Sequence, residues 1–144
     1  MDWFKKLLSA KNYNTKQDDL ALAMLRVFIG ATMAFSHGLG KIPPPEMLVQ
    51  GVSSLGFPMP EMFAWSAGLA EFVGGLLLAI GFLTRPAAAF VVFTMGVAAF
   101  AVHAADPFAK KEMALLYFFA ALFFVLHGAG RWSVDHLLTK KNNM

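Results

Sequence analysis

The apolar positions of this chain fall into four long runs, separated by short segments that are polar or rich in Pro and Gly. Each run is close to the approximately 20 residues that a membrane-spanning helix needs. The longest intervening segment, residues 41–60, is too polar and too broken by Pro to cross a bilayer, so we expect a loop there with a short helix over residues 46–55. The pattern predicts an all-α integral membrane protein, a four-helix bundle with spans over about residues 20–39, 61–83, 86–103 and 111–126.

The first 17 residues differ from these runs, because apolar and basic side chains share helical spacing there. Trp3, Phe4, Leu7 and Leu8 stand beside several lysines, which is typical of a short amphipathic helix that lies in the membrane interface. The charges are not followed by an uninterrupted apolar core, so a cleaved signal peptide is not expected.

Composition supports a membrane location. Of the 144 residues, 58% are hydrophobic and 15% are charged, respectively above and below the averages of soluble domains. A soluble domain of this size would bury only about two-thirds of its surface and would leave large apolar patches in water, whereas lipid would cover them. Cysteine is absent, which excludes disulfides, thiolate metal sites and iron–sulfur ligation by the chain. We therefore expect no intrinsic cofactor, and a redox cofactor would belong to a partner.

Lys and Arg in the flanks of the four runs predict the orientation. One side carries eight of these residues and the other three, and the more basic side faces the cytoplasm by the positive-inside rule. Because these cations flank apolar runs and are not interleaved with stacking aromatics, a nucleic-acid partner is not expected. We expect both termini in the cytoplasm, as an interfacial segment (1–17) and a tail (139–144) around a transmembrane domain (18–138). The basic side comprises Lys5, Lys6, Lys11, Lys16, Arg85, Arg131, Lys140 and Lys141, and the other comprises Lys41, Lys110 and Lys111.

Two ionisable residues fall inside the predicted spans. A charge near the centre of a spanning helix costs at least about 2.5 to 3.5 kcal/mol, so Arg26 and Glu71 each need a partner. Arg26 lies roughly 9 Å from the cytoplasmic side and Glu71 roughly 15 Å from the outer side, which brings them to similar levels in antiparallel helices. We therefore predict an ion pair between Arg26 and Glu71. It would serve either as a structural clamp between two helices or as part of a site for a polar ligand.

Further polar residues continue this face of the first helix. Arg26, Gly30, Met33, His37 and Lys41 follow one another at helical spacing. This face would look into the bundle. His37 and Lys41, together with residues near the outer ends of other spans, would line an outward-facing vestibule; alternatively, those residues only anchor the helices at the interface. The chain has no His pair at i, i+4 and no Glu-x-x-His motif, so no metal site is predicted. The other vestibule candidates are Glu61, His103 and Glu112.

Several short motifs follow one another in a fixed order along residues 18–138. They are Arg26 with Gly30, Phe35-Ser36-His37-Gly38 with Lys41, Leu55-Gly56-Phe57-Pro58, Glu71-Phe72-Val73-Gly74-Gly75, Leu83-Thr84-Arg85 and Gly128-Ala129-Gly130-Arg131-Trp132-Ser133-Val134-Asp135. In this order they resemble the DoxX family, which often has Pro where this chain has Ala129. The resemblance implies a small four-helix protein of the bacterial inner membrane, related to the membrane subunit of thiosulfate:quinone oxidoreductase or terminal quinol oxidase complexes. A role linked to respiratory redox chemistry is the expectation that follows.

Three classes of function remain open, and the sequence does not decide whether the chain is itself an enzyme. The first is a quinone-linked oxidoreductase component, with Glu71 and His37 as the catalytic candidates. The second is a non-catalytic membrane subunit or assembly factor that docks a redox partner protein through residues 43–60. The third is a small-solute transporter, for which four spans without inverted repeats give little support unless the protein forms a homo-oligomer. In the first class the quinone would contact Arg26, His37, Lys41, Glu71, His103 and Glu112, and a gap left by Gly30, Gly68, Gly74 and Gly75 would admit its ring.

Overall fold

The computed structural model describes residues 15–141, and every regular element in that range is a helix, as the predicted all-α class requires. The predicted interfacial helix over residues 1–17 lies outside the described residues except at its last three positions. The elements are α2 (Lys16–Thr32), which continues through a π-helical turn η1 (Met33–Gly38) and a 3-10 turn η2 (Leu39–Lys41), α3 (Glu46–Ser54), α4 (Pro60–Ile80), α5 (Thr84–Val97) with a π-helical turn η3 (Ala98–Val102), α6 (Phe108–His127) and α7 (Val134–Lys141).

Three helical stretches within the described residues are long and apolar enough to cross a membrane. They are Lys16–Lys41, Pro60–Ile80 and Thr84–Val102, and they match the first three predicted spans. α6 covers the predicted fourth span, but three charged residues follow one another near its start, Lys110, Lys111 and Glu112. That α6 crosses the membrane, and that both termini are cytoplasmic, stay predictions.

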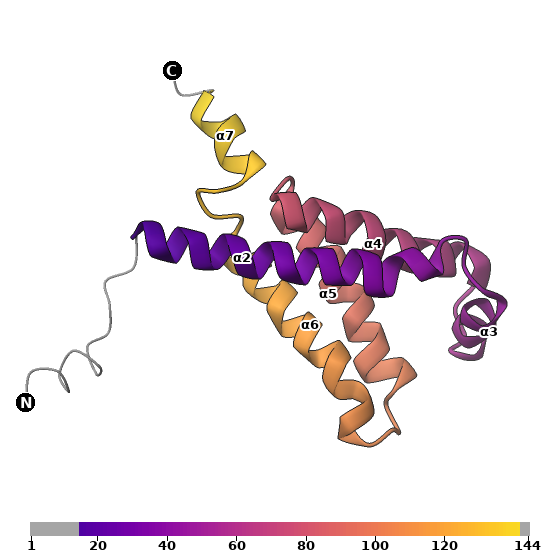
Figure 1. The fold of residues 1–144 in the computed structure, drawn as a ribbon. Coiled ribbons are helices and arrows are strands. Elements are labelled where there is room, and N and C mark those ends of the chain that lie inside the picture. Colours follow the sequence, from indigo (N-terminus) through magenta and orange to yellow (C-terminus); the bar gives the residue numbers. More distant parts are fainter. Residues whose placement is uncertain (1–14, 142–144) are drawn as a thin grey trace, which may run out of the picture.

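The long helices are arranged as two antiparallel pairs. α2 and α4 lie side by side, and α5 and α6 form a second pair that crosses the first obliquely (Figure 1). Where the pairs meet, the core contains the buried side chains of Met33, Val91, Met95, Tyr117 and Ala121. Large apolar side chains also cover the exterior, Phe90, Phe93 and Phe119 among them, as expected for helices that face lipid.

Glycines bring the backbones of α2 and α4 into close contact. A Cβ atom added to Gly30 would lie 2.5 Å from the carbonyl oxygen of Gly75, and one added to Gly75 would lie 2.8 Å from the amide nitrogen of Ala34. Small residues at such positions let membrane helices approach closely. The prediction that the glycines leave a gap for a ligand ring is therefore wrong, because the neighbouring backbone fills that space.

The first span does not end as a regular α-helix. The π-helical turn η1 inserts wider hydrogen-bonded turns between Met33 and Gly38, a feature that often marks functional positions. Gly38 thereby lies on the backbone of α4, where an added Cβ would be 2.6 Å from Phe72 Cα and 2.7 Å from the Glu71 carbonyl carbon. The end of the span, with Lys41, is held directly over the middle of α4.

The long loop after the first span is ordered by a short helix, as predicted. α3 (Glu46–Ser54) packs against α4, and the rings of Phe57 and Phe63 lie 5.0 Å apart between centroids. α3 crosses the direction of α2 and α4 at their end (Figure 1). This loop therefore covers the Lys41 end of the α2–α4 pair.

Candidate functional site

Arg26 is buried among backbone carbonyl groups. The residue is 2% exposed, and its guanidinium donates hydrogen bonds to the carbonyl oxygens of Ala79 (3.4 Å), Trp132 (2.7 Å) and Ala129. Ala79 is in the last turn of α4, and the other two lie between α6 and α7. The carbonyl ends of helices carry partial negative charge, which stabilises a cation there. The predicted ion pair between Arg26 and Glu71 is wrong, because carbonyl oxygens take the place of the carboxylate.

The register of the two helices explains the error. Arg26 is level with Ala79, whereas Glu71 is level with Gly38 near the other end of the first span. Ala79 is eight residues beyond Glu71, about 12 Å along the helix. The prediction measured depth from residue 20, but the helix begins at Lys16 and extends past the end of α4. Arg26 is therefore level with the last turn of α4 and not with its middle.

A second polar contact lies beside Arg26, at the start of α5. The carboxylate of Asp135 accepts hydrogen bonds from the backbone N–H groups of Leu83 (2.8 Å) and Thr84 (3.0 Å). The backbone N–H of Asp135 in turn donates to the carbonyl oxygen of Gly81 (2.9 Å). Asp135 thus caps a helix far away in sequence. We call Arg26, Gly81, Leu83, Thr84 and Asp135 the Arg26 network.

Partial burial of Asp135 disfavours its charged form, but other interactions outweigh this effect. The hydrogen bonds from Thr84 and Leu83, together with the nearby Arg26 guanidinium, hold the pKa of Asp135 below its ordinary value. No role was predicted for Asp135 from the sequence. The signal was present, since Leu83-Thr84-Arg85 and the segment ending in Asp135 are two of the motifs shared with a known family, and the structure brings them together.

The partner of Glu71 is Lys41. The Lys41 ammonium lies 2.6 Å from each carboxylate oxygen of Glu71. The Glu71 side chain is 3% exposed, whereas that of Lys41 is 30% exposed. An added Cβ at Gly68 would lie 2.7 Å from the Lys41 carbonyl oxygen, so glycine at this position allows the lysine backbone to approach α4. The pair combines a buried acid with a cation that reaches the surface.

His37 lies four residues before Lys41, and its ring contacts α6. It meets the ring of Tyr117 edge to face, with 5.0 Å between centroids. Tyr117 is buried in the core and His37 is half-buried. We call His37, Lys41, Glu71 and Tyr117 the Lys41 site. It combines a cation and an imidazole from the end of the first span, an acid from the middle of α4 and a phenol from the middle of α6.

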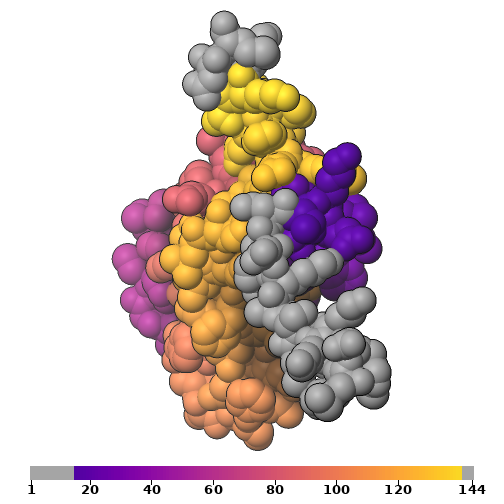
Figure 2. Space-filling model, turned by 90° about the vertical axis from the view of Figure 1, so that its left-hand side faces the viewer, coloured from indigo at the N-terminus to yellow at the C-terminus, as the bar shows by residue number. Residues whose placement is uncertain are grey.

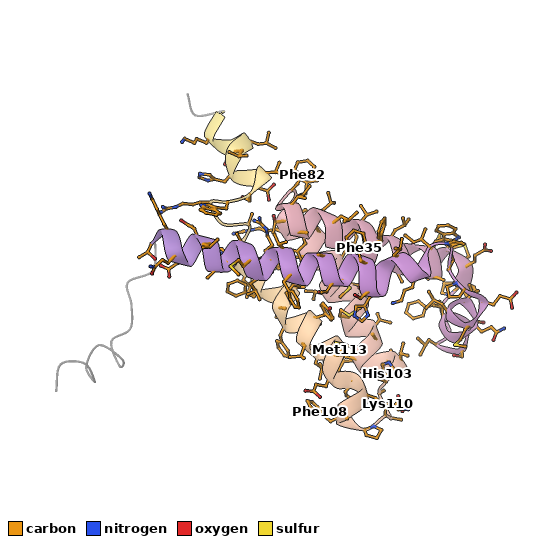
Figure 3. The ribbon with its side chains drawn as sticks, viewed as in Figure 1. Phe35, Phe82, His103, Phe108, Lys110 and Met113 are labelled. Carbon is orange, nitrogen blue, oxygen red and sulfur yellow. The ribbon has the colours of Figure 1, made fainter. Side chains whose placement is uncertain are left out.

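The remaining predicted site residues lie elsewhere. His103 Nδ1 is 2.8 Å from a carboxylate oxygen of Asp106 in its own loop, and this hydrogen bond, with the nearby Lys110, holds the pKa of Asp106 below its ordinary value. Figure 3 places His103 and Lys110 at the connection between α5 and α6, away from α3. Glu112 is exposed near the start of α6. Among residues 15–141, no three His, Asp or Glu side chains gather as a metal site would require.

Glu61 lies at a different surface, between α3 and α4. With Val49, Pro60, Met62 and Trp65 it lines an apolar groove of about 590 Å³. The groove continues toward Pro43 and Glu46 at the start of α3.

Comparison with known proteins identifies the family to which the chain belongs. The DoxX family model matches residues 21–104, which is more than half of the chain. The matched range contains Arg26, Lys41 and Glu71 but ends before Tyr117 and Asp135. The chain matches no solved structure.

Several bacterial proteins are similar along much of their length. An uncharacterized protein of Haemophilus influenzae is 37% identical over 128 residues, which cover 83% of this chain and 92% of that protein. The inner membrane protein YqjF of Escherichia coli is 28% identical over 135 residues, covering 88% and 98% of the two chains. The inner membrane protein YphA, also of Escherichia coli, is 41% identical over 67 residues, covering 46% and 48%.

Proposed function

Because the chain belongs to the DoxX family and is a multi-pass protein of the bacterial inner membrane, we propose that it is a redox-associated component whose Lys41 site binds the headgroup of a quinone. The site lies where the end of the first candidate span meets the middle of α4, within reach of the polar ring of a quinone dissolved in the bilayer. The predicted binding set is thereby reduced to His37, Lys41 and Glu71, with Tyr117 added.

One observation carries this proposal: the unequal exposure of Glu71 and Lys41. Glu71 is 3% exposed while its only cationic partner within the described chain is 30% exposed. Water weakens the attraction between two charges, so a pair whose cation reaches the surface contributes little as a clamp between helices. Here the cation instead connects a buried acid to the surface. Ionisable groups placed this way inside a membrane protein commonly bind ligands or transfer protons.

The chemistry of a quinone headgroup fits these side chains. The Lys41 ammonium would donate a hydrogen bond to a quinone carbonyl oxygen, and the Glu71 carboxylate would accept one from a quinol hydroxyl. Oxidation of a quinol releases two electrons and two protons. Glu71 would take one proton and His37 would take the other. The electrons would pass to a redox centre on a partner protein, because the chain has no cysteine to hold a cluster.

The proposal is tested by binding of a short-chain ubiquinone or menaquinone analogue to the full-length protein in detergent. We expect Glu71→Gln and Lys41→Gln to weaken binding at least tenfold, since each loses a charge-assisted hydrogen bond. Lys111→Gln removes the same charge from the α5–α6 end, where Lys111 donates to the Ala104 carbonyl oxygen, and should bind normally. A wild-type protein that binds neither analogue would contradict the proposal.

A second candidate function is a non-catalytic subunit that docks a partner protein, and the groove between α3 and α4 favours it. Trp65, Met59 and Met62 are exposed there, at a surface that the loop after the first span builds. A photo-crosslinking residue placed at Met62 in whole cells would report the contact. Adducts with one defined protein at Met62, and their absence at Phe93 on the lipid-facing side of α5, are expected for this function.

A further inference from the structure

The last described helix, α7, presents apolar and basic side chains away from the rest of the molecule. Leu137 is 66% exposed and Leu138 49% exposed, and Trp132, just before the helix, is 56% exposed. Arg131 and Lys140 are exposed as well, and the sequence adds a lysine at position 141. Figure 2 shows α7 standing out from the body of the molecule. We call Arg131, Trp132, Leu137, Leu138 and Lys140 the α7 surface.

The direction of α7 is fixed by bonds at its first turn. Ser133 Oγ donates to the carbonyl oxygen of Gly130 (2.6 Å) and accepts from the backbone N–H of His136 (3.2 Å). Asp135 joins the helix to the start of α5 through its carboxylate and its backbone N–H. Arg26 holds the carbonyl oxygen of Trp132. The helix is therefore anchored to Arg26 of α2 and to the turn between α4 and α5.

From that anchor α7 runs across the direction of α2 and α4 and does not extend them (Figure 1). α4 and the stretch Thr84–Val102 are candidate membrane spans, and the turn that joins them lies at this point, so it marks a membrane boundary. α7 begins at this boundary, so its exposed side chains lie next to the headgroups of the adjoining leaflet. Its length of eight residues suits an interfacial position, since it is too short to span.

We infer that the α7 surface binds anionic phospholipid headgroups of the adjoining leaflet. Its chemistry fits this occupant in two ways. Leu137 and Trp132 can enter the boundary between headgroups and acyl chains, where an indole ring is favoured. Lys140 supplies an exposed cation for phosphate groups, and the sequence continues with a second lysine. Asp135, the acid of this helix, is directed to the Leu83 and Thr84 N–H groups and not to the lipid. The inference does not depend on quinone binding.

The test is backbone hydrogen exchange of residues 134–141 in the full-length protein, reconstituted in nanodiscs. One set contains phosphatidylcholine alone, and the other contains equal amounts of phosphatidylcholine and phosphatidylglycerol. For the wild type we expect slower exchange in the anionic nanodiscs at low salt. Each lysine that is neutralised by substitution should weaken the affinity of the helix for anionic lipid roughly fivefold. The double variant Lys140→Gln/Lys141→Gln should lose the difference between the two lipids. Leu137→Ser should exchange faster in both.

A matched control is present in the chain. Lys110→Gln/Lys111→Gln removes the same charge from another adjacent lysine pair, at the α5–α6 connection, and should leave exchange in α7 unchanged. Thermal unfolding of each variant separates lost lipid contact from lost folding. Equal exchange in the two lipid compositions would overturn the inference, as would equal loss in the control pair. Protection that arises only on adding a second protein would overturn it as well.

Discussion

The two ends of the α2–α4 pair each bury a charge, and they do so in opposite ways. Arg26 is surrounded by carbonyl oxygens from α4 and from the connection between α6 and α7, and it is 2% exposed. Glu71 is buried as deeply, but its partner Lys41 is 30% exposed. The Arg26 network joins segments that are far apart in sequence, whereas the Lys41–Glu71 pair joins the end of one span to the middle of the next.

This difference shows that burial of a charge does not by itself mark a functional site. A cation at the carbonyl ends of helices is satisfied by the backbone and has no spare capacity for a ligand. An acid whose single cationic partner is open to the surface can exchange that partner for a ligand. We therefore interpret the Arg26 network as structural and the Lys41 site as functional.

The largest effect is expected at Arg26. Arg26→Gln removes charge-assisted hydrogen bonds and leaves buried carbonyl groups with fewer donors, so we expect a loss of about 3 to 5 kcal/mol in the free energy of unfolding. Arg26→Lys keeps the charge but not the forked geometry and should lose less. Denaturant titration in detergent measures both. If Arg26→Gln stayed within about 1 kcal/mol of the wild type, the network would not be structural and the comparison would fail.

A smaller loss is expected at Gly38, where the first span lies on Glu71 and Phe72. Gly38→Ala places a methyl group against backbone atoms that cannot move aside, so overpacking should lower the free energy of unfolding by about 1 to 3 kcal/mol. Gly40→Ala is the matched control, because an added Cβ there has nothing within 4 Å. Equal unfolding midpoints for the two variants would show that the Lys41 end is packed more loosely than described.

Asp135 adds a pH dependence to the Arg26 network. Its pKa is lower in the folded protein than in the unfolded chain, so its contribution is complete above the ordinary Asp pKa of about 4 and is lost as the pH falls through the folded value. Asp135→Asn should reduce the free energy of unfolding at pH 7 by about 1 kcal/mol, as for a lost helix cap. It should also flatten the acid limb of the stability profile below about pH 4. If the loss of stability below about pH 4 were the same in the mutant, other carboxylates would be its cause.

The smallest effect on stability is expected at Glu71. Glu71→Gln leaves the Lys41 ammonium without its carboxylate, but that ammonium is partly exposed and water can hydrate it. We expect a change of about 1 kcal/mol or less at pH 7, measured by the same denaturant titration. A loss as large as that of Arg26→Gln would mean that both ends are sealed structural clamps, which would remove the distinction between them.

Hydrophobic periodicity was sufficient to predict the class of fold. The first three spans and the short helix after the first were found, because apolar runs and Pro-rich segments set them directly. α7 was missed, since eight residues with two lysines at the end carry too weak a pattern. The sequence also could not show that backbone atoms fill the space beside these glycines. Whether Gly30 faces a ligand or the backbone of Gly75 depends on how closely the two helices approach.

The charged residues of the spans were identified correctly as exceptional, but their partners were not. Their pairing depends on the register between two helices, and an error of a few residues at one helix end moves a side chain by several Å. Carbonyl oxygens as partners of Arg26 leave no signature in the sequence, because every residue has one. Lys41 was predicted to share a helix face with Arg26 and His37, but its pairing with Glu71 was not predicted.

A functional Lys41 site should affect quinone binding, whereas a structural Arg26 network should affect stability. Binding of a short-chain quinone analogue to Glu71→Gln, measured beside its unfolding midpoint, tests this most directly. We expect Glu71→Gln to fold with nearly wild-type stability and to bind the quinone analogue at least tenfold more weakly. Wild-type affinity in a stable Glu71→Gln protein would contradict it, and so would a variant that unfolds as readily as Arg26→Gln.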